Sequence, residues 1–265
     1  MTKLFTSILL LLFLLWMPVS ITASEELHAI KEHESTNQLY DRAIQFFTRK
    51  MPEMFEKRLN NSYQYIDLVT EIFQEKDIPV EIAYLPLIES EFSPLLVGPG
   101  DAAGLWQFVK GTARKYGLRI DKYVDERKDP VKSTYAAAHY LRDLHSMFGA
   151  WDIALAAYNA GEGRIKRILN KCESECFPFI IKRYLASFMA AFTIAQDPER
   201  YGFESYESTR KEAADYREIK TDRIISLKTL AEKFNTTVRA IKQLNPALLT
   251  DTTPPYAYMI RVPNS

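Results

Sequence analysis

The sequence has few cysteines, few histidines and no excess of charge. Its 265 residues include two Cys and four His, and 34 basic residues balance 34 acidic ones. A near-neutral chain lacks the broad positive field that nucleic-acid binding needs, so we expect no nucleic-acid partner. Two Cys without a nearby His fall short of the four ligands of a structural zinc site, and His139 and His145 share no helix face. We therefore expect no metal.

Signatures of phosphate and cofactor binding are missing too. The sequence contains no phosphate loop, nucleophile elbow or dinucleotide fingerprint, so no cofactor is expected. The hydrophobic residues make up 47% of the chain, which is ample for a packed core. The length suggests one large domain, or a medium domain with a small module.

The one long apolar run lies at the start of the chain. Lys3 precedes an almost unbroken apolar stretch from Leu4 to Met17, and small residues suited to cleavage follow. This layout predicts a secretory signal over residues 1–23, with an uncleaved N-terminal anchor as the alternative. Removing that segment deletes one Lys and no acid, so the formal charge would move from +0 to about −1. No later segment is apolar enough to span a bilayer.

The two cysteines, Cys172 and Cys176, are close together in the sequence. In a helix, residues at this spacing lie on one face with their Cα atoms about 6 Å apart, which is within disulfide reach. An exported chain meets an oxidising compartment, so we expect a local disulfide, with two free thiols as the alternative.

Helical periodicity dominates most of the chain. It predicts an N-terminal helical segment over residues 24–62 and an all-α domain over residues 63–200. Capping residues and glycines mark the expected helices, which are Val80–Ile88, Ser133–Phe148, Trp151–Asn159 and Tyr184–Ala195. The fold class is therefore expected to be mostly α.

A small module of another kind is expected at the end of the chain. Polar residues and turn formers predict a linker over residues 201–214. Residues 215–265 then read as strand, helix, helix and strand, over Tyr216–Lys220, Leu227–Phe234, a helix ending at Leu244, and Tyr256–Val262. A module this small has little room for chemistry of its own.

Two glutamates in an apolar run are the first candidates for chemistry. In the stretch IAYLPLIESEF, Glu89 has Leu85 and Phe92 at helical offsets of four and three residues. Such surroundings disfavour the ionised carboxylate and raise its pKa, which suits a general acid at neutral pH. The pattern also fits two exposed glutamates at a helix end, because exposed Glu is common, and it does not separate Glu89 from Glu91.

Four short motifs follow one another along residues 79–196. They are Glu89–Ser90 in PLIESEFSP, Gly104–Gln107 in AAGLWQFVKGTARKYGL, Ala157–Gly161 in AAYNAGEGR, and Tyr184 in FPFIIKRYLASFMA. With the stretch YVDERKDPVKSTYAAAHYL between the second and third, this region resembles the catalytic domain of family 1 lytic transglycosylases, in particular the membrane-bound lytic murein transglycosylase D type. The resemblance implies a lysozyme-like helical domain that acts on peptidoglycan.

The resemblance also implies a mechanism. In that family one Glu protonates the glycosidic oxygen between N-acetylmuramic acid and N-acetylglucosamine. Its carboxylate then takes the proton of the muramoyl O6 hydroxyl, which attacks the anomeric carbon and closes a 1,6-anhydro ring without consuming water. Glu89 is the implied catalytic acid, and no second carboxylate is required, unlike in most glycosidases. Glu162 stays open as another acid.

Further residues of the motifs are implied to bind the substrate: Ser90, Gly104, Leu105, Gln107, Tyr158, Asn159 and Tyr184. Gly104 permits a tight turn and the close approach of a sugar. The amides of Gln107 and Asn159 can bond sugar hydroxyls and N-acetyl groups. Structural roles are the alternative for each, as a helix-end hydroxyl, a cap or a core tyrosine. Trp106 is expected in the core.

Two stretches depart from the family pattern. Gly98–Asp101 stands where the family commonly has a Ser and a Gly–Ala pair, which leaves the shape of that loop open. Ile180–Ile181 stands where relatives often carry Glu–Thr, so we expect the wall near Tyr184 to be built differently.

The C-terminal module resembles a divergent LysM domain, from TLAEKFNTTVRAIKQLNPAL to YMIRVP. This resemblance implies glycan binding, with a structural cap on the catalytic domain as the alternative. Two other functions for the whole chain stay open: a hydrolase on a goose-type lysozyme-like fold, and an inactive glycan-binding protein. The expected partner is peptidoglycan, and the expected location is exported, periplasmic or associated with the cell envelope.

Overall fold

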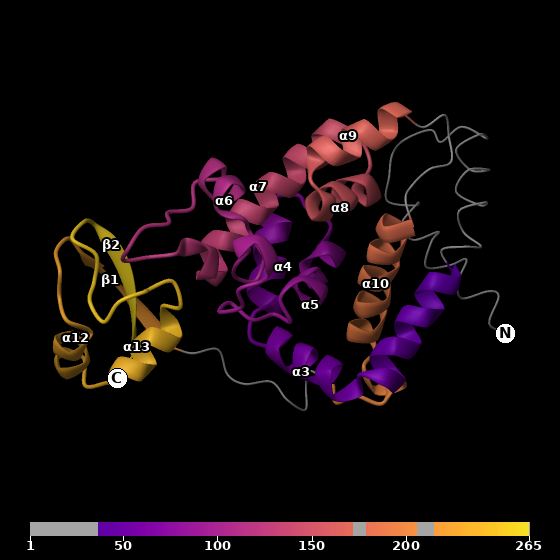
Figure 1. Ribbon diagram of the computed structural model, residues 1–265. Helices are drawn as coiled ribbons and strands as arrows, with labels where there is room; N and C mark the ends of the chain where they lie inside the picture. The colour runs from indigo at the N-terminus through magenta and orange to yellow at the C-terminus, as the bar shows by residue number, and fades with distance from the viewer. Residues whose placement is uncertain (1–36, 172–178, 206–214, 265) are drawn as a thin grey trace. The chain divides into compact units, whose positions relative to one another are not determined.

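The computed structural model describes residues 37–171, 179–205 and 215–264 (Figure 1). The predicted signal over residues 1–23 and the predicted disulfide between Cys172 and Cys176 lie outside the described residues, so both stay predictions. Contacts divide the chain into Met1–Gln38 and Leu39–Ser265, and the elements below belong to the second unit. Among the described residues, no helix has the length and apolar character needed to cross a membrane.

Helices make up most of the described chain, which confirms the predicted mostly α class. After helical residues 39–45, the longer elements are η1 (Phe46–Lys50, a π-helix), α3 (Pro52–Ser62), α4 (Ile66–Glu75), α7 (Pro130–Phe148), α8 (Trp151–Ala160), α9 (Glu162–Lys171) and α10 (Phe179–Gln196). Shorter ones are η2 (Val80–Tyr84), α5 (Pro86–Glu89), η3 (Pro99–Asp101), α6 (Lys110–Lys115), η4 (Glu126–Lys128) and η5 (Glu199–Tyr201).

The ends of α7 follow from local capping. The Asp129 side chain accepts hydrogen bonds from the N–H groups of Val131 and Lys132, and Pro130 occupies the first turn, where its missing N–H costs nothing. The helix therefore begins three residues before the predicted Ser133. Gly149 ends it with φ 76°, a left-handed conformation that glycine adopts without strain.

The predicted helix over Val80–Ile88 is divided in two. A 3-10 helix, η2, ends at Tyr84, and α5 begins at Pro86. Pro86 has no N–H to donate to the preceding turn, so a continuous α-helix cannot run through it. The short helix that results places Glu89 at its last position.

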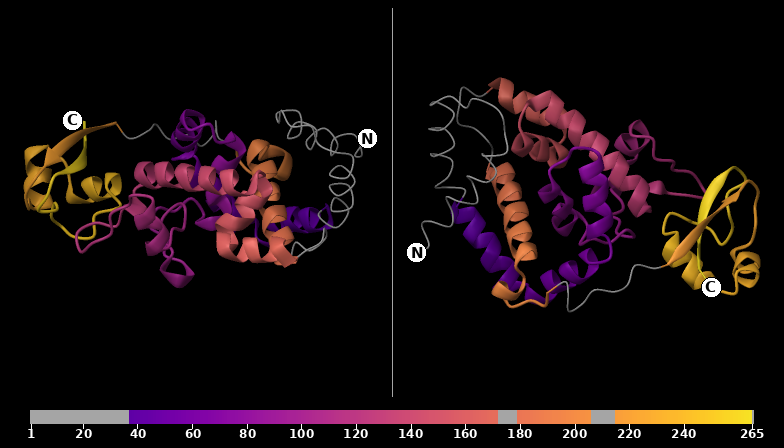
Figure 2. Two further views of the ribbon diagram at one scale, coloured as in Figure 1. Left: turned by 90° about the horizontal axis from the view of Figure 1, so that it is seen from above. Right: turned by 180° about the vertical axis from the view of Figure 1, so that it is seen from behind.

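The larger core forms where α10 packs against α5, η2 and α8 (Figure 1 and Figure 2). This packing brings the motifs around Glu89, Tyr158 and Tyr184 together from segments far apart in the sequence. The largest fully buried side chain is that of Trp106, which stacks on Phe73 with 5.2 Å between ring centroids.

The C-terminal module has the predicted order of strand, helix, helix and strand. Strands β1 (Tyr216–Thr221) and β2 (Tyr258–Pro263) pair antiparallel, with Tyr216 opposite Pro263. The Ser226 side chain caps α12 (Leu227–Lys233), and the Thr237 side chain caps α13 (Val238–Leu244). Both caps are the residue types that favour helix starts.

The loop between α6 and α7 contributes to the core of this module. Val124 is fully buried in the cluster that holds Leu227, Ile241 and Ile260. The backbone N–H of Asp125 donates to the carbonyl of Ala247 at 2.9 Å. A buried ion pair of 3.2 Å joins Arg261 to Asp129, the cap of α7. Side-chain packing and hydrogen bonds therefore hold the module to this loop.

Candidate active site

Three helices converge on the carboxyl group of Glu89, the last residue of α5. The hydroxyl of Tyr184, on α10, donates a hydrogen bond of 2.6 Å to Oε1 of Glu89. The side chain of Asn159, at the end of α8, hydrogen-bonds the same carboxyl group. The structure thus brings together residues from the first, third and fourth sequence motifs.

Burial controls the protonation of Glu89. Desolvation raises the pKa of its carboxyl group, and the hydrogen bonds from Tyr184 and Asn159 lower that pKa by less. Because burial disfavours the charged form, the side chain holds its proton to higher pH than an ordinary glutamate.

A second Glu–Tyr pair in the same protein lies at an exposed position. The Tyr135 hydroxyl donates to Glu75 at 2.6 Å, the same distance as in the Tyr184–Glu89 pair. Glu75 is exposed, and hydrogen bonds from Lys76 and then Tyr135 lower the pKa of its carboxyl group. Glu75 thus differs from Glu89 in its exposure and in its bond to Lys76, and desolvation is the largest effect on the pKa of Glu89.

Two tyrosines at the site remain protonated over the whole working range of pH. Burial, followed by the charge of Glu89, raises the pKa of both Tyr184 and Tyr158 well above 10. Tyr184 therefore serves as a donor to the carboxylate. Tyr158 donates instead to the backbone carbonyl of Trp106 at 2.6 Å, which ties the end of α8 to the second motif.

The second motif forms a loop that is hydrogen-bonded to α5. The hydroxyl of Ser90 donates to the carbonyl of Leu105 at 2.7 Å. The side chains of Ser90 and Leu105 are both fully buried. This hydrogen bond joins the loop to Ser90, the residue next to Glu89.

Gly104 and Gln107 shape the same loop. Gly104 has φ 81°, and a Cβ added there would lie 1.7 Å from the carbonyl oxygen of Arg127. The close approach that requires glycine is therefore to the protein's own backbone. Gln107 also has a positive φ of 47°, and its Nε2 donates to the carbonyl of Gly104 at 2.9 Å.

Trp106 belongs to the core, as predicted. Its side chain has no exposed surface, and its Nε1 donates to the hydroxyl of Thr134 at 2.9 Å. Of the two isoleucines that depart from the family pattern, Ile181 is buried in the larger core cluster. An apolar side chain therefore stands one turn before Tyr184.

Sequence reasoning missed the ion pair that supports the loop of the second motif. Arg127 is 2% exposed and bonds both carboxylate oxygens of Asp125, at 2.9 and 2.7 Å. Its Nη1 also donates to the carbonyl of Phe108 at 3.0 Å. Such bidentate pairs fix geometry well. The stretch YVDERKDP carries these residues, but nothing in its composition separates them from surface charges.

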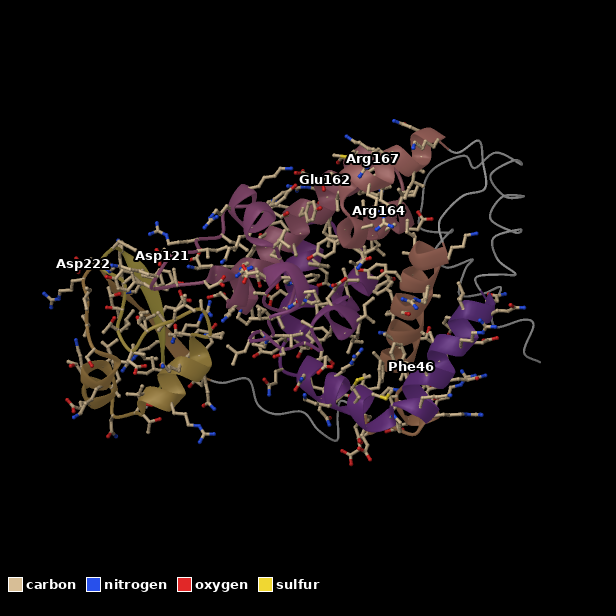
Figure 3. All side chains as sticks on the ribbon, viewed as in Figure 1. Phe46, Asp121, Glu162, Arg164, Arg167 and Asp222 are labelled. Atoms are coloured by element: carbon tan, nitrogen blue, oxygen red, sulfur yellow. The ribbon has the colours of Figure 1, made fainter. Side chains whose placement is uncertain are left out.

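Other charged groups lie apart from the carboxyl of Glu89. Glu162, on α9, accepts a 3.0 Å hydrogen bond from Tyr140. Arg164 and Arg167, which Figure 3 labels on the same helix, are exposed. In the described part of the chain, no group of three His, Cys, Asp or Glu could hold a metal ion.

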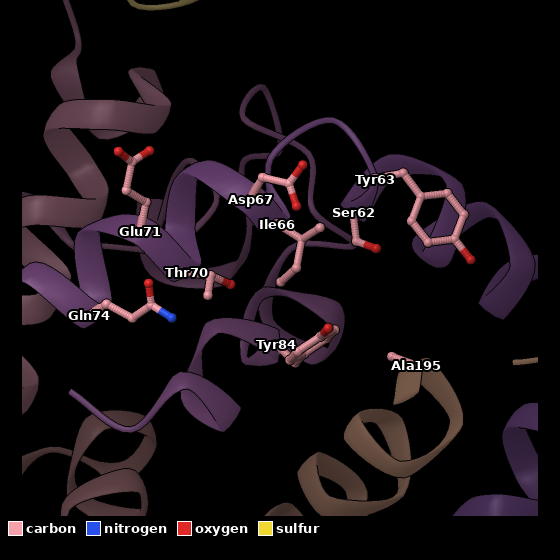
Figure 4. Close-up of a pocket in the computed structure, with 9 residues that line it drawn as sticks. All are labelled: Ser62, Tyr63, Ile66, Asp67, Thr70, Glu71, Gln74, Tyr84 and Ala195. Atoms are coloured by element: carbon pink, nitrogen blue, oxygen red, sulfur yellow. The ribbon is translucent and has the colours of Figure 1, made fainter. Parts of the chain in front are cut away.

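A pocket of about 370 Å³ opens beside α4 and does not include Glu89 (Figure 4). Asp67, Thr70, Glu71 and Gln74 of α4 line one wall, with Tyr84 opposite. None of the residues of the four sequence motifs lines it. We therefore place the candidate active site at Glu89, where the buried carboxyl group and its donors meet.

Comparison with known proteins finds similarity over the region that contains Glu89. Residues 71–175 match the family model of the transglycosylase SLT domain. This region is therefore similar to an SLT domain. The membrane-bound lytic murein transglycosylase D of Escherichia coli (strain K12) is 35% identical over 139 residues, or 49% of this chain and 31% of the relative. This similarity confirms the predicted resemblance to the transglycosylase D type.

Two further proteins are similar to parts of the chain. The peptidoglycan transglycosylase gp16 of Escherichia phage T7 is 39% identical over 79 residues, or 29% of this chain and 6% of the relative. A crystal structure of the 70 kDa soluble lytic transglycosylase from Escherichia coli matches with a TM-score of 0.45 and 23% identity, over 73% of this chain and 33% of that one. The chain thus spans about a third or less of the length of these relatives.

Proposed function

We propose that the protein is a peptidoglycan lytic transglycosylase with Glu89 as its catalytic acid and base. One observation carries the proposal: within an SLT domain, a buried glutamate with a raised pKa is held by donors from Tyr184 and Asn159. A general acid works best when its pKa lies near the working pH, and burial moves Glu89 in that direction.

In the first step, protonated Glu89 donates its proton to the glycosidic oxygen that links N-acetylmuramic acid to N-acetylglucosamine. The bond between that oxygen and the anomeric carbon then breaks, and Glu89 is left as a carboxylate. The hydrogen bonds from Tyr184 and Asn159 stabilise this charged form, because donors to a carboxylate favour ionisation. The same groups therefore act at the moment when negative charge develops.

In the second step, the Glu89 carboxylate accepts the proton of the muramoyl O6 hydroxyl. The O6 oxygen attacks the anomeric carbon, and a 1,6-anhydro ring closes. Glu89 regains the proton that it gave up, so the cycle consumes no water and needs no second carboxylate. Desolvation of the carboxylate makes it a stronger base than an exposed glutamate, which suits this step.

The remaining residues of the motifs divide between substrate and scaffold. Asn159 is exposed at the end of α8 and is placed to bond a sugar as well as Glu89. Gln107 is partly exposed and its amide bonds the carbonyl of Gly104, so it remains a proposed substrate contact. We propose that Ser90, Gly104, Leu105 and Tyr158 shape the wall of the site, given their burial and bonds to the protein's own backbone.

The proposed substrate sets the proposed location. Peptidoglycan lies in the cell envelope, so the chain would act after export, as the apolar run over residues 1–23 predicts. The C-terminal module remains a proposed binding site for glycan strands, because its strand–helix–helix–strand order fits the LysM-like pattern of its sequence. No metal or cofactor enters the proposed reaction.

The test is to digest purified peptidoglycan with the full chain and identify the products by mass spectrometry. We expect 1,6-anhydromuramic acid ends. Reducing ends would instead indicate a hydrolase, and intact glycan bound by the protein would indicate an inactive binding protein.

Matched variants then test the acid. Glu89→Gln keeps the shape but cannot donate or accept the proton, so we expect a rate loss of about 100-fold or more. Glu75→Gln is the control, because Glu75 has the same tyrosine bond at an exposed position, and it should retain the wild-type rate. An active Glu89→Gln would refute the assignment, and loss of activity in Glu162→Gln would point to a second carboxylate.

A further inference from the structure

The turn that follows Glu89 is held by a helix outside the SLT match. The match covers residues 71–175, whereas α3 spans Pro52–Ser62. Helix α3 packs against α5, which ends at Glu89. Its contacts with this turn are made by two side chains, Arg58 and Asn61, so the segment before the SLT match reaches the catalytic glutamate's neighbours.

The turn itself is strained. Glu91 has φ 56° and Phe92 has φ 52°, although neither is glycine. Left-handed conformations of such residues are unfavourable and persist only where surrounding contacts over-determine them. Phe92 is fully buried, and its N–H donates back to the carbonyl of Pro86 at 3.1 Å. The turn therefore closes the end of α5 and fixes where Glu89 lies.

Arg58 and Asn61 supply hydrogen bonds that hold the turn in this strained conformation. Nη1 of Arg58 donates to the carbonyl of Leu87 at 3.2 Å, and Nη2 lies 3.4 Å from Oε1 of Glu91. Nδ2 of Asn61 donates to the carbonyl of Glu91 at 2.9 Å. The side chain of Arg58 is only 14% exposed, so its bonds are shielded from water. One guanidinium thus bridges α5 and the turn on either side of Glu89.

We propose that Arg58 and Asn61 are positioning residues for Glu89, and that they act through the strained turn at Glu91 and Phe92. This inference rests on the proposed function of Glu89. Without these bonds the turn relaxes toward ordinary dihedral angles, and the end of α5 moves relative to Tyr184 on α10 and Asn159 on α8. The carboxyl group then loses its alignment with the glycosidic bond, while residues that bind the glycan elsewhere are unaffected.

The expected effect is on the rate of the chemical step. A misplacement of about 1 Å can lower a rate by roughly 100-fold, so Arg58→Met should lower kcat by about 10- to 100-fold and leave KM nearly unchanged. Lysine keeps the charge but cannot donate to Leu87 and Glu91 as a fork does. Arg58→Lys should therefore recover only part of the rate.

Lys57→Met is the matched control. Lys57 also pairs with the carboxylate of Glu91, at 3.5 Å, but its side chain is 68% exposed and bonds no backbone of α5. Exposed ion pairs contribute little to structure, so this variant should keep the wild-type kcat. An equal loss in both variants would mean that charge at Glu91, and not the bridge by Arg58, sets the rate, which overturns the proposal.

A rescue variant tests the strain directly. Glycine adopts positive φ without a steric penalty, so adding Glu91→Gly to Arg58→Met relieves the strain at the first of the two positions. We expect the double variant to be faster than Arg58→Met alone. A double variant with no recovery would show that the strained conformation of Glu91 is not what Arg58 maintains.

A titration separates failure of this inference from failure of the proposed function. The ¹³C resonance of the Glu89 carboxyl group, identified by its absence in Glu89→Gln, is followed against pH in the full chain without substrate. Relaxation of the turn admits water, so the pKa of Glu89 should fall toward the ordinary range in Arg58→Met and stay unchanged in Lys57→Met. Absence of anhydro products from the wild type would refute the proposed function, whereas the titration would still show whether Arg58 positions Glu89.

Asn61→Ala keeps the test decisive if Arg58→Met does not fold. It removes one bond to the Glu91 carbonyl and should shift kcat and the titration in the same directions by smaller amounts. Wild-type values for both quantities, in Asn61→Ala and in any folded Arg58 variant, would overturn the inference.

Discussion

Gly104 offers a sharp test of how the loop beside the active site is built. Its φ of 81° is unfavourable for any residue with a Cβ, at a cost of about 1–2 kcal/mol for alanine. Alanine would also place its Cβ 1.7 Å from the Arg127 carbonyl oxygen, although real Cβ contacts essentially never fall below 3.0 Å. Removing this clash would require the two backbones to separate by about 1.3 Å.

The clash cannot be relieved cheaply. Arg127 is anchored by the buried pair with Asp125 and by its bond to the carbonyl of Phe108, so its backbone has little freedom. Overpacking of this kind costs about 1–3 kcal/mol, and contacts between backbones belong at the upper end. Together with the dihedral cost, Gly104→Ala should destabilise the protein by about 4–5 kcal/mol.

Gly117→Ala is the control for the dihedral cost alone. Gly117 has a φ of 84°, but a Cβ added there would meet nothing within 4 Å. We expect it to cost only about 1–2 kcal/mol. For a domain of this size, about 1 kcal/mol lowers Tm by roughly 2–4 °C. Gly117→Ala should therefore lower Tm by about 2–8 °C, and Gly104→Ala by about 8–20 °C. Equal decreases in thermal unfolding would refute the close approach to Arg127.

Three further predictions concern protonation and the buried ion pair. Tyr184→Phe removes a hydrogen bond that lowers the pKa of Glu89, so the alkaline limb of the kcat/KM profile should move to higher pH. Tyr158→Phe loses only a bond to Trp106 and should leave that limb in place. An unmoved limb in Tyr184→Phe would contradict this prediction. Because the pKa of Glu89 is raised in the folded protein, its ionisation destabilises the fold as the pH rises above 4.5, the usual pKa of a glutamate. The Tm of Glu89→Gln should therefore exceed that of the wild type increasingly as the pH rises, and this difference should disappear at acidic pH. A constant difference from acidic to neutral pH would count against it. Arg261→Met leaves Asp129 without its buried partner and should lower the free energy of unfolding in urea by about 3 kcal/mol. Adding Asp129→Asn should give a total loss smaller than the sum of the losses in the two single variants.

Local signals in the sequence were sufficient for much of the fold. Glycines that end α7 and α8, and Ser226 and Thr237 that cap α12 and α13, act within a few residues of their own position. Such effects are readable from sequence because the partner groups are backbone atoms nearby. Pro86 carried a similar local signal, and the break that it causes between η2 and α5 follows from its missing N–H.

The contacts between distant segments could not be read in this way. Resemblance identified the positions of Ser90 and Gln107, but whether such side chains face the substrate or the protein depends on how the loop folds over α5. In the structure the Ser90 hydroxyl donates to Leu105, and the Gln107 amide donates to Gly104. Arg127 and Asp125 form a buried bidentate pair that a charged stretch of sequence does not reveal, because paired and solvated charges have the same composition.

The distinction between Glu89 and Glu91 depends on one of these tertiary contacts. Both glutamates sit among apolar residues, and helical periodicity assumes that α5 continues through them. The helix instead ends at Glu89, and the positive φ of Glu91 turns the chain. Glu91 is thereby directed to Lys57 and Arg58 on α3, whereas Glu89 is enclosed by Tyr184 and Asn159. Desolvation favours the proton on the Glu89 carboxyl group, whereas the Glu91 carboxylate forms ion pairs with Lys57 and Arg58. The turn that separates the two residues therefore also separates an ion-paired carboxylate from a proton donor.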